Sequence, residues 1–180
     1  LRDDLAEMKE KDILTPEKLN SVLEESCIYF PSSSYVDYPD VSYYDHVKLT
    51  AAVASCMYIY DAEKENNEIN YKDKYLVSGE FSGIQNFIYT ITSKIAMKSL
   101  RGRSFYLELF IEHIIDEILE ALNLSRVNLV YSAGSQFYML LPNIPETVRV
   151  LEEYKNIIND FLLKELGTSV YYEISYTGTS

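Results

Sequence analysis

The stretch VNLVYSAGSQFYMLL, residues 127–141, decides the fold. Two runs rich in β-branched, aromatic and other apolar residues, 127–131 and 136–141, flank four small residues, Ser132-Ala133-Gly134-Ser135. Apolar runs of this length on either side of a glycine-containing turn are typical of a β-hairpin. The sequence therefore predicts two antiparallel strands joined by a tight turn.

A helical pattern lies on each side of this hairpin. Upstream, a long helix is predicted from about Ser104 to Leu122, because apolar side chains recur there every three or four positions. Downstream, Pro145 is a favoured first residue of a helix and Gly167 a favoured residue after its end. Each helix is expected to bury one apolar face against the hairpin.

One further strand is predicted at each end of this region, over residues 75–78 and 170–176. A short helix that starts at Ser82 and reaches about Thr92 precedes the long one. The order is strand, helix in two pieces, strand, strand, helix, strand. This α+β arrangement is ferredoxin-like (βαββαβ), an antiparallel sheet with helices on one face. Such a fold is shared by many functions and identifies none of them.

The first third of the chain is predicted to be a helical segment, residues 1–60. One helix starts at Thr15 and Pro16, a capping residue followed by proline, and ends near Ser26. A second helix covers residues 43–60, and its stretch LTAAVA is apolar nearly all round, which predicts burial. Residues 61–74 are polar and aperiodic and are interpreted as a linker to the ferredoxin-like domain, residues 75–180.

Composition excludes several classes of protein. The 180 residues are 47% hydrophobic and 24% charged, which excludes a disordered chain. The net charge of −12 argues against a stand-alone nucleic-acid binder, whose affinity depends on neutralising phosphates. No apolar run reaches the ~20 residues of a membrane span. Without such a run we expect no membrane partner. The two cysteines, Cys27 and Cys56, are too few for a disulfide scaffold, so we expect the protein to work in a reducing cytoplasm.

The junction between the first strand and the short helix is the strongest candidate site. Gly79 and Gly83 are expected to let a phosphate approach the backbone, and Ser82 with Gln85 has the spacing of a capping box. Free backbone N–H groups at a helix start favour an anion. Glu80 stands where a carboxylate could hold a divalent metal beside phosphates. An ordinary strand-to-helix turn with a good cap explains the same residues.

The hairpin turn, residues 132–135, carries no carboxylate. Palm-type polymerases and cyclases hold two magnesium ions on paired carboxylates at such a turn. This domain therefore lacks that metal-binding element, and a plain turn is the simpler interpretation. The two histidines, His46 and His113, are also too few for a hydrolytic metal centre, so we interpret both as structural.

A basic segment interrupts the acidic sequence. No acidic residue occurs between Glu80 and Glu108. The bases in that window are Lys94, Lys98, Arg101 and Arg103. They could meet phosphates or an acidic partner, and a solvated helix face is the common alternative.

Several long motifs resemble one known family. They are GEFSGIQNFIY (79–89), KSLRGRSFYL (98–107), YSAGSQFY (131–138) and, upstream, YPDVSYYDHVK (38–48). Together they are similar to the large subunit of type III-A (Csm-type) CRISPR effector complexes, in the same order and over most of the chain. The resemblance implies a fragment that spans the end of an HD domain, residues 1–60, and the first palm domain, residues 75–180.

The resemblance also implies a function. The family is part of an RNA-guided antiviral effector. Its large subunit makes cyclic oligoadenylates from ATP, as a nucleotidyltransferase with Mg²⁺ or Mn²⁺, and degrades single-stranded DNA through its HD domain. The catalytic acidic hairpin belongs to a second palm domain, so we expect no catalytic residue here and no activity from this fragment alone.

The site residues implied by the resemblance lie at the strand-to-helix junction and at the hairpin turn. They are Gly79, Glu80, Phe81, Ser82, Gly83, Gly134 and Ser135. Ser82 is the candidate contact to adenine or ribose. Glu80 is the candidate metal ligand, although most relatives carry aspartate at that position.

The expected partners are the other subunits of the effector complex, guide RNA and target RNA held through that complex, and the second palm domain of the same subunit. One alternative stays open. The chain could be a non-catalytic scaffold module that docks a neighbouring subunit of the ribonucleoprotein and binds no nucleotide.

Overall fold

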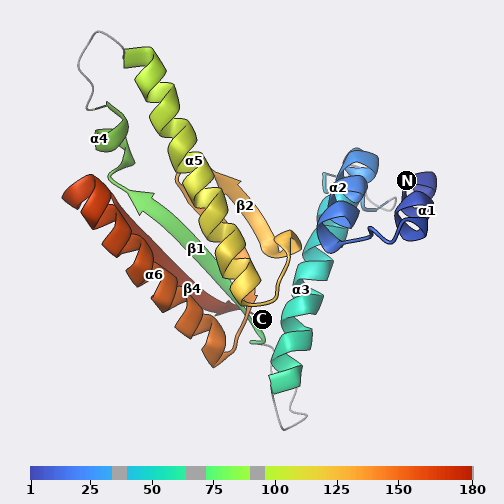
Figure 1. Cartoon of the computed structure of the whole chain (residues 1–180). Coiled ribbons are helices and arrows are strands. Elements are labelled where there is room, and N and C mark those ends of the chain that lie inside the picture. Colours follow the sequence, from blue (N-terminus) through green and yellow to red (C-terminus); the bar gives the residue numbers. More distant parts are fainter. Residues whose placement is uncertain (34–39, 64–71, 90–95, 180) are drawn as a thin grey trace.

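A four-stranded antiparallel sheet forms the centre of the computed structural model, which describes residues 1–33, 40–63, 72–89 and 96–179 (Figure 1). The strands are β1 (Lys74–Ser82), β2 (Leu129–Ala133), β3 (Gln136–Pro142) and β4 (Tyr171–Thr179). Their order in the sheet is β2-β3-β1-β4. This is the order of a ferredoxin-like fold, so the predicted fold class is confirmed.

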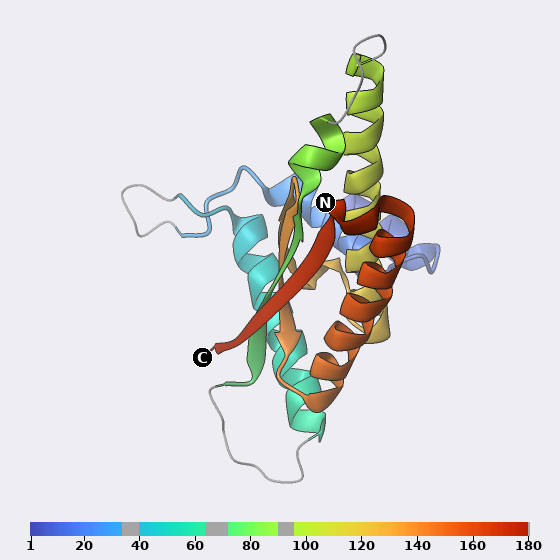
Figure 2. The same cartoon turned by 90° about the vertical axis from the view of Figure 1, so that its left-hand side faces the viewer.

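Two long helices, α5 (Ala96–Ala121) and α6 (Pro145–Leu166), cover one face of the sheet (Figures 1 and 2). The apolar repeat predicted for α5 forms the core, with Ile111, Ile114 and Ile118 at most 3% exposed. They pack with inward residues of β1, β3 and β4 and with α6. Gly167, with φ of 68°, ends α6 as expected.

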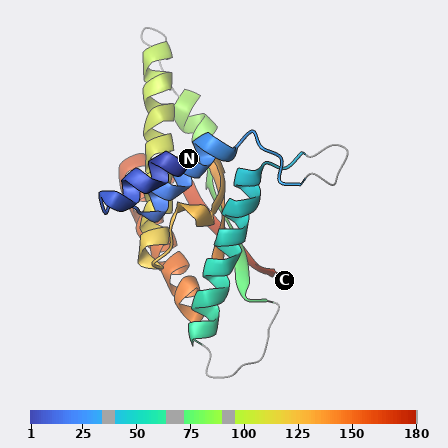
Figure 3. The same ribbon diagram turned by 90° about the vertical axis from the view of Figure 1, so that its right-hand side faces the viewer.

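The helical segment consists of α1 (Arg2–Glu10), α2 (Pro16–Cys27) and α3 (Tyr43–Glu63). The Thr15 side chain caps α2 by accepting from the Lys18 N–H, as the sequence predicts. α1 was not predicted, and none of its residues is buried. α2 lies beside the start of α3 (Figure 3), where the Tyr44 hydroxyl donates to Asn20 at 3.2 Å.

α3 lies on the face of the sheet opposite α5 and α6 (Figure 2). Asn128 lies at the contact between α3 and the sheet. It is the last residue of a short 3-10 helix, η1 (Arg126–Asn128), and its side chain is fully buried. Its side-chain amide donates to Ser55 Oγ at 3.0 Å and to the Leu140 carbonyl at 2.9 Å. One buried amide thus joins the helical segment to the sheet.

The predicted burial of residues 49–54 is wrong. Ala52 is fully buried, whereas Leu49 is 40% exposed and Thr50, Ala51 and Ala54 are also exposed. The reason is geometric, because α3 meets the sheet with one face only and the sequence is apolar on its other face as well. Among the residues described, nothing covers that second face.

Several predicted boundaries also shift. The linker over residues 61–74 is shorter at both ends, because α3 continues to Glu63 and β1 starts at Lys74; residues 64–71 lie outside the described residues. β1 runs on to Ser82, and β2 starts at Leu129 after the η1 turn. α5 begins at Ala96, so the segment Arg101-Gly102-Arg103 lies inside a helix rather than before one.

Gly79 has a packing role that the sequence did not reveal. It pairs with Phe137 across β1 and β3, and a Cβ built at Gly79 would lie 2.1 Å from the Phe137 ring. That ring is fully buried and packs against Tyr172. The missing side chain makes room for an aromatic ring of the core, and the expectation that it admits a phosphate is wrong.

Replacing Gly79 with alanine is expected to lower the free energy of unfolding by about 1–3 kcal/mol, since the added methyl group would force the fully buried Phe137 ring to move. Urea denaturation of the chain measures the loss. Phe137→Leu shortens the opposing side chain, so Gly79→Ala should cost less in that background than in the wild type. Equal costs in the two backgrounds would contradict the assigned clash.

Tyr172→Phe is expected to keep or raise stability at neutral pH by about 1 kcal/mol, because the buried Tyr172 hydroxyl has no hydrogen-bond partner among the described residues. Burial also raises the pKa of Tyr172 above its ordinary 10. The folded state therefore disfavours the phenolate, and stability present below pH 10 should fall as the pH rises above it.

Denaturation at pH 7 and pH 11 tests this expectation, with Tyr171→Phe as the control because Tyr171 is the adjacent residue on β4 and is 55% exposed. Tyr172→Phe should lose less stability between the two pH values than wild type or the control. A marked loss of stability for Tyr172→Phe at pH 7 would show that the hydroxyl does have a partner.

Candidate functional site

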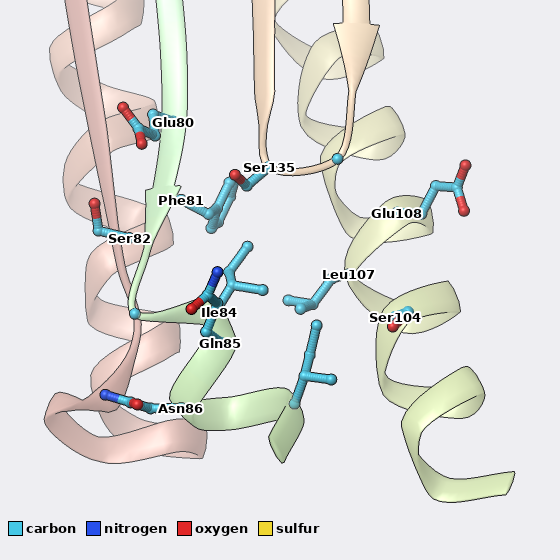
Figure 4. Close-up of a pocket in the computed structure, with 13 residues that line it drawn as sticks. Glu80, Phe81, Ser82, Ile84, Gln85, Asn86, Ser104, Leu107, Glu108 and Ser135 are labelled. Atoms are coloured by element: carbon cyan, nitrogen blue, oxygen red, sulfur yellow. The ribbon is translucent and has the colours of Figure 1, made fainter. Parts of the chain in front are cut away.

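An open pocket of about 710 Å³ lies where β1 bends into the short helix α4 (Ile84–Tyr89) (Figure 4). Three segments far apart in the sequence form its walls: the bend itself, one face of α5, and the turn between β2 and β3. The pocket lies at the end of the sheet, at the edge of the apolar core. A ligand can therefore reach it without unpacking the domain.

Six of the seven predicted site residues line this pocket. They are Glu80, Phe81, Ser82, Gly83, Gly134 and Ser135. The seventh, Gly79, lies beneath the Phe137 ring and is not part of the lining. The fold thus brings six of these candidates, from the β1 junction and from the hairpin turn, to one place.

The α4 and α5 walls were missed. α4 contributes Ile84, Gln85, Asn86 and Ile88, and α5 contributes Ser104, Leu107 and Glu108. In the close-up, Leu107 and Ile84 point toward each other across the pocket (Figure 4). The spacing of Ser104, Leu107 and Glu108, three and four residues apart, places them on one helix face and was the available signal. Which neighbour that face meets could not be known from the pattern.

The bend depends on Gly83. Its φ is +82°, and a Cβ there would lie 1.8 Å from the Ser169 carbonyl oxygen. The Gly83 carbonyl accepts the N–H of Phe87 at 3.2 Å, so Gly83 holds the N-cap position of α4. Ser82 is instead the last residue of β1, paired with Tyr171. The predicted capping box of Ser82 and Gln85 is therefore wrong, and the close backbone neighbour of Gly83 is Ser169.

The hairpin turn is held against β1. The Phe81 N–H donates to the Ser135 carbonyl at 2.9 Å. The Phe81 ring is 2% exposed and packs on Tyr172 and Phe110, at 4.9 and 5.9 Å between centroids. It forms the floor of the pocket, whereas Gly134, with φ of +64°, has open space where a side chain would stand.

Two carboxylates lie at the pocket, on opposite walls. Glu80 is exposed on β1, and Glu108 stands on α5 (Figure 4). Across the strands Glu80 is paired with Glu173, whose carboxylate accepts from Lys155 Nζ at 2.7 Å. Among the residues described, no three metal-binding side chains converge. Glu80 is thus a single exposed carboxylate at the pocket rather than a member of a convergent set of ligands.

The basic segment divides into two kinds of residue. Lys98 and Arg101 are exposed on α5. Arg103 donates to the Phe87 carbonyl and lies over the Phe87 ring, 4.9 Å from its centroid, so it ties α5 to α4. Lys94 lies outside the described residues. Arg103 is thus explained by packing, and Lys98 and Arg101 remain available to solvent.

Neither histidine reaches the pocket. His46 is exposed in the first turn of α3, where its backbone N–H donates to Ser42. His113 is exposed on α5 and lies 3.8 Å from Glu117. The structural role predicted for the two side chains therefore stays a prediction. In the described part of the chain, no helix is both long and apolar enough to cross a membrane.

A family model described as Csm1 subunit domain B matches residues 74–180, the whole of the sheet with α4, α5 and α6. Two curated relatives are each 39% identical to the chain, one from Mycobacterium tuberculosis and one from Enterococcus italicus. Both are named CRISPR system single-strand-specific deoxyribonuclease Cas10/Csm1 (subtype III-A). The matches cover 93% and 89% of this chain but only 22% and 24% of the relatives.

Solved structures show the same similarity. The chain matches an apo Csm1-Csm4 cassette with a TM-score of 0.86 at 33% identity, over 98% of this chain and 24% of that one. Csm1 of T. onnurineus matches with a TM-score of 0.81 at 35% identity, over 91% and 23%. A Csm1-Csm4 cassette in complex with one ATP matches with a TM-score of 0.82 at 33% identity, also over 91% and 23%.

Gly83→Ala is expected to destabilise the chain more than Gly134→Ala. At Gly83 the added methyl group would collide with backbone, whereas at Gly134 it meets nothing within 4 Å. Gly134→Ala bears only the cost of a left-handed φ, about 1 kcal/mol. Thermal denaturation of the two variants side by side measures the difference. Equal melting temperatures would contradict the close contact between Gly83 and Ser169.

Proposed function

We propose a function from one premise: the chain belongs to the Csm1 family of subtype III-A CRISPR systems, and its residues 74–180 correspond to domain B of that subunit. In this proposal domain B is the first palm domain of the large subunit of an RNA-guided antiviral effector. It binds ATP and supports synthesis of cyclic oligoadenylates together with a second palm domain outside these 180 residues. The chain by itself turns over no ATP.

The observation that carries the proposal is the pocket at the β1–α4 bend. It is open, about 710 Å³ in volume, and combines apolar side chains with hydroxyl, amide and carboxylate groups. This is the mixture that a nucleotide needs, with an apolar surface for the base and polar groups for ribose and phosphates. Structures similar to this chain include Csm1-Csm4 cassettes in complex with one ATP, with pppApA and with cA4.

The described residues suggest a division of roles. Ile84 and Leu107 offer apolar contact to adenine, and the Ser82 hydroxyl contacts base or ribose. The open space at Gly134 accommodates the remainder of the nucleotide. In the transfer step a ribose hydroxyl would displace pyrophosphate from the α-phosphate of a second ATP and lose its proton to solvent; Glu80 would supply one ligand to a magnesium or manganese ion, which would neutralise phosphate charge. No residue of this chain is assigned a catalytic role.

The helical segment belongs to the proposal as the end of an HD domain, which in the whole subunit degrades single-stranded DNA. The division into this segment, a linker and a palm domain remains a proposal, with α3 ending at Glu63 and β1 starting at Lys74. The partners proposed for the whole subunit are the other subunits of the effector complex, the guide and target RNA held through it, and the second palm domain. A subunit named Csm4 accompanies Csm1 in several similar structures.

A docking role is the second candidate, and exposed aromatic residues favour it. Tyr29 is 94% exposed, Phe30 64% and Tyr58 77%, all in the helical segment. Such side chains are enriched at protein interfaces. In this alternative the chain is a scaffold for a neighbouring subunit and the pocket stays empty of nucleotide.

Ser82→Ala in the complete subunit is expected to weaken ATP binding about three- to tenfold, as the loss of one hydrogen bond to the nucleotide predicts. Calorimetric titration with ATP and Mg²⁺ measures it. Ser78→Ala is the matched control, because Ser78 lies on the same strand and the same face but does not line the pocket. Equal affinities for the two variants would refute the nucleotide role of Ser82, and a wild type that binds no ATP would favour the scaffold.

Glu80→Gln is expected to raise the Mg²⁺ concentration needed for half-maximal oligoadenylate synthesis, with the melting temperature unchanged, because the Glu80 carboxylate is exposed and makes no ion pair among the described residues, its neighbours across the strands being Gln136 and Glu173. A magnesium titration of the assembled complex provides the measurement. Glu173→Gln, on the adjacent strand and outside the pocket lining, is the control and should leave the magnesium dependence unaltered.

A further inference from the structure

One carboxylate connects the hairpin turn to α5. The Ser132 hydroxyl, on β2, donates to Glu112 Oε1 at 3.0 Å. Arg126 donates from its Nη1 to the second oxygen of Glu112 at 2.6 Å and from its Nε to Asp116 at 2.7 Å. Glu112 is thus held from two directions, and its side chain is 34% exposed.

This connection joins two walls of the pocket from outside the pocket. Glu112 follows Glu108 by one helical turn of α5, and Glu108 lines the pocket whereas Glu112 does not. Ser132 precedes Gly134 and Ser135, which line the facing wall. The third wall is already fixed to the turn by the hydrogen bond from the Phe81 N–H to the Ser135 carbonyl.

The sheet holds the two arms of this hairpin unequally: β3 is paired along its length with β1, whereas β2 has β3 as its one neighbour in the sheet. β2 has five residues, lies at the edge of the sheet and pairs only with β3. Its register with β3 shifts between Leu129 and Tyr131. A short edge strand with an irregular register is less restrained by backbone hydrogen bonds than the β3 arm, whose end at the turn is fixed to Phe81. The hydrogen bond from Ser132 to Glu112 adds a restraint between the β2 arm and α5.

We propose that Glu112 is a positioning residue that sets the separation of the α5 wall and the Gly134–Ser135 wall of the pocket. It does so through Ser132, while Arg126 orients its carboxylate. The inference rests on the proposed function, because the ligand that needs this separation is the nucleotide. Asp116 also accepts a hydrogen bond from Arg126, but it makes no contact with β2 among the described residues. It therefore binds the guanidinium group without restraining the hairpin turn.

Ser132→Ala and Ser132→Thr, made in the complete subunit within its assembled complex, test the proposal. Ser132→Ala removes the hydroxyl that reaches Glu112 and should raise the KM for ATP about three- to tenfold with little change in kcat. Ser132→Thr keeps a hydroxyl and should restore the wild-type KM. Asp116→Asn is the control and should leave KM unchanged. Equal KM values for Ser132→Ala and Asp116→Asn would overturn the proposal.

A double mutant isolates the interaction. Glu112→Ala should raise KM as much as Ser132→Ala, and the combination of both should raise it no further, because each single change already removes the same contact. Effects that multiply in the double mutant would show that the two residues act independently and would overturn the proposal.

Hydrogen exchange of the peptide that carries residues 133–136 gives a readout that needs no nucleotide. Exchange should be faster in Ser132→Ala and Glu112→Ala than in wild type or Asp116→Asn, with equal melting temperatures. If wild type binds no ATP but exchange changes in this pattern, the proposed function fails and the mechanical contact stands without it. If ATP binds and exchange in the turn does not change, the positioning role of Glu112 is refuted.

Discussion

The arrangement of the strands in this domain depends on close packing between β1 and the aromatic side chains beneath it. Phe137 occupies the space that a side chain at Gly79 would fill, and the next inward residue of β1, Phe81, packs on Tyr172. Phe137 and Tyr172 in turn lie 6.4 Å apart between ring centroids. Because interiors are close-packed, these rings leave few alternative positions for one another. They hold the three adjacent strands β3, β1 and β4 in one arrangement up to the point where β1 bends.

The pocket exists because that arrangement ends abruptly. Gly83 turns the chain away from the sheet against the Ser169 carbonyl, and the hairpin turn stops level with Phe81 through the Ser135 carbonyl. α5 continues past the end of the sheet and supplies a third wall (Figures 1 and 4). The buried aromatic rings beneath the pocket and its open side therefore both result from the end of the packed strands at Phe81 and Gly83. A site built on the ends of packed strands and one long helix is well placed to hold a ligand in a defined orientation.

This architecture suits a component of a composite site. The pocket offers an apolar wall, polar groups and one candidate metal ligand, but the described residues bring together no set of carboxylates of the kind that drives phosphoryl transfer. In the proposed function the missing chemistry comes from another domain of a subunit more than four times longer, since the chain spans about a quarter of the relatives it matches. Glu112 and Ser132 then matter because a composite site tolerates little error in where each half holds its nucleotide.

Sequence alone determined the features that depend on neighbours along the chain. The hairpin, the apolar repeat of α5, the proline and glycine at the ends of α6 and the cap at Thr15 are local signals, and each was confirmed. The motifs around Ser82 and Gly134 likewise led to residues that line the pocket. Tertiary structure alone decided what those residues contact. It assigned Gly79 to Phe137, Gly83 to Ser169 and Arg103 to Phe87, left most of residues 49–54 exposed, and brought Ser104, Leu107 and Glu108 of α5 to the pocket. The physical reason is that periodicity tells which face of an element is apolar or polar, whereas the neighbour of that face is set by packing between segments distant in sequence.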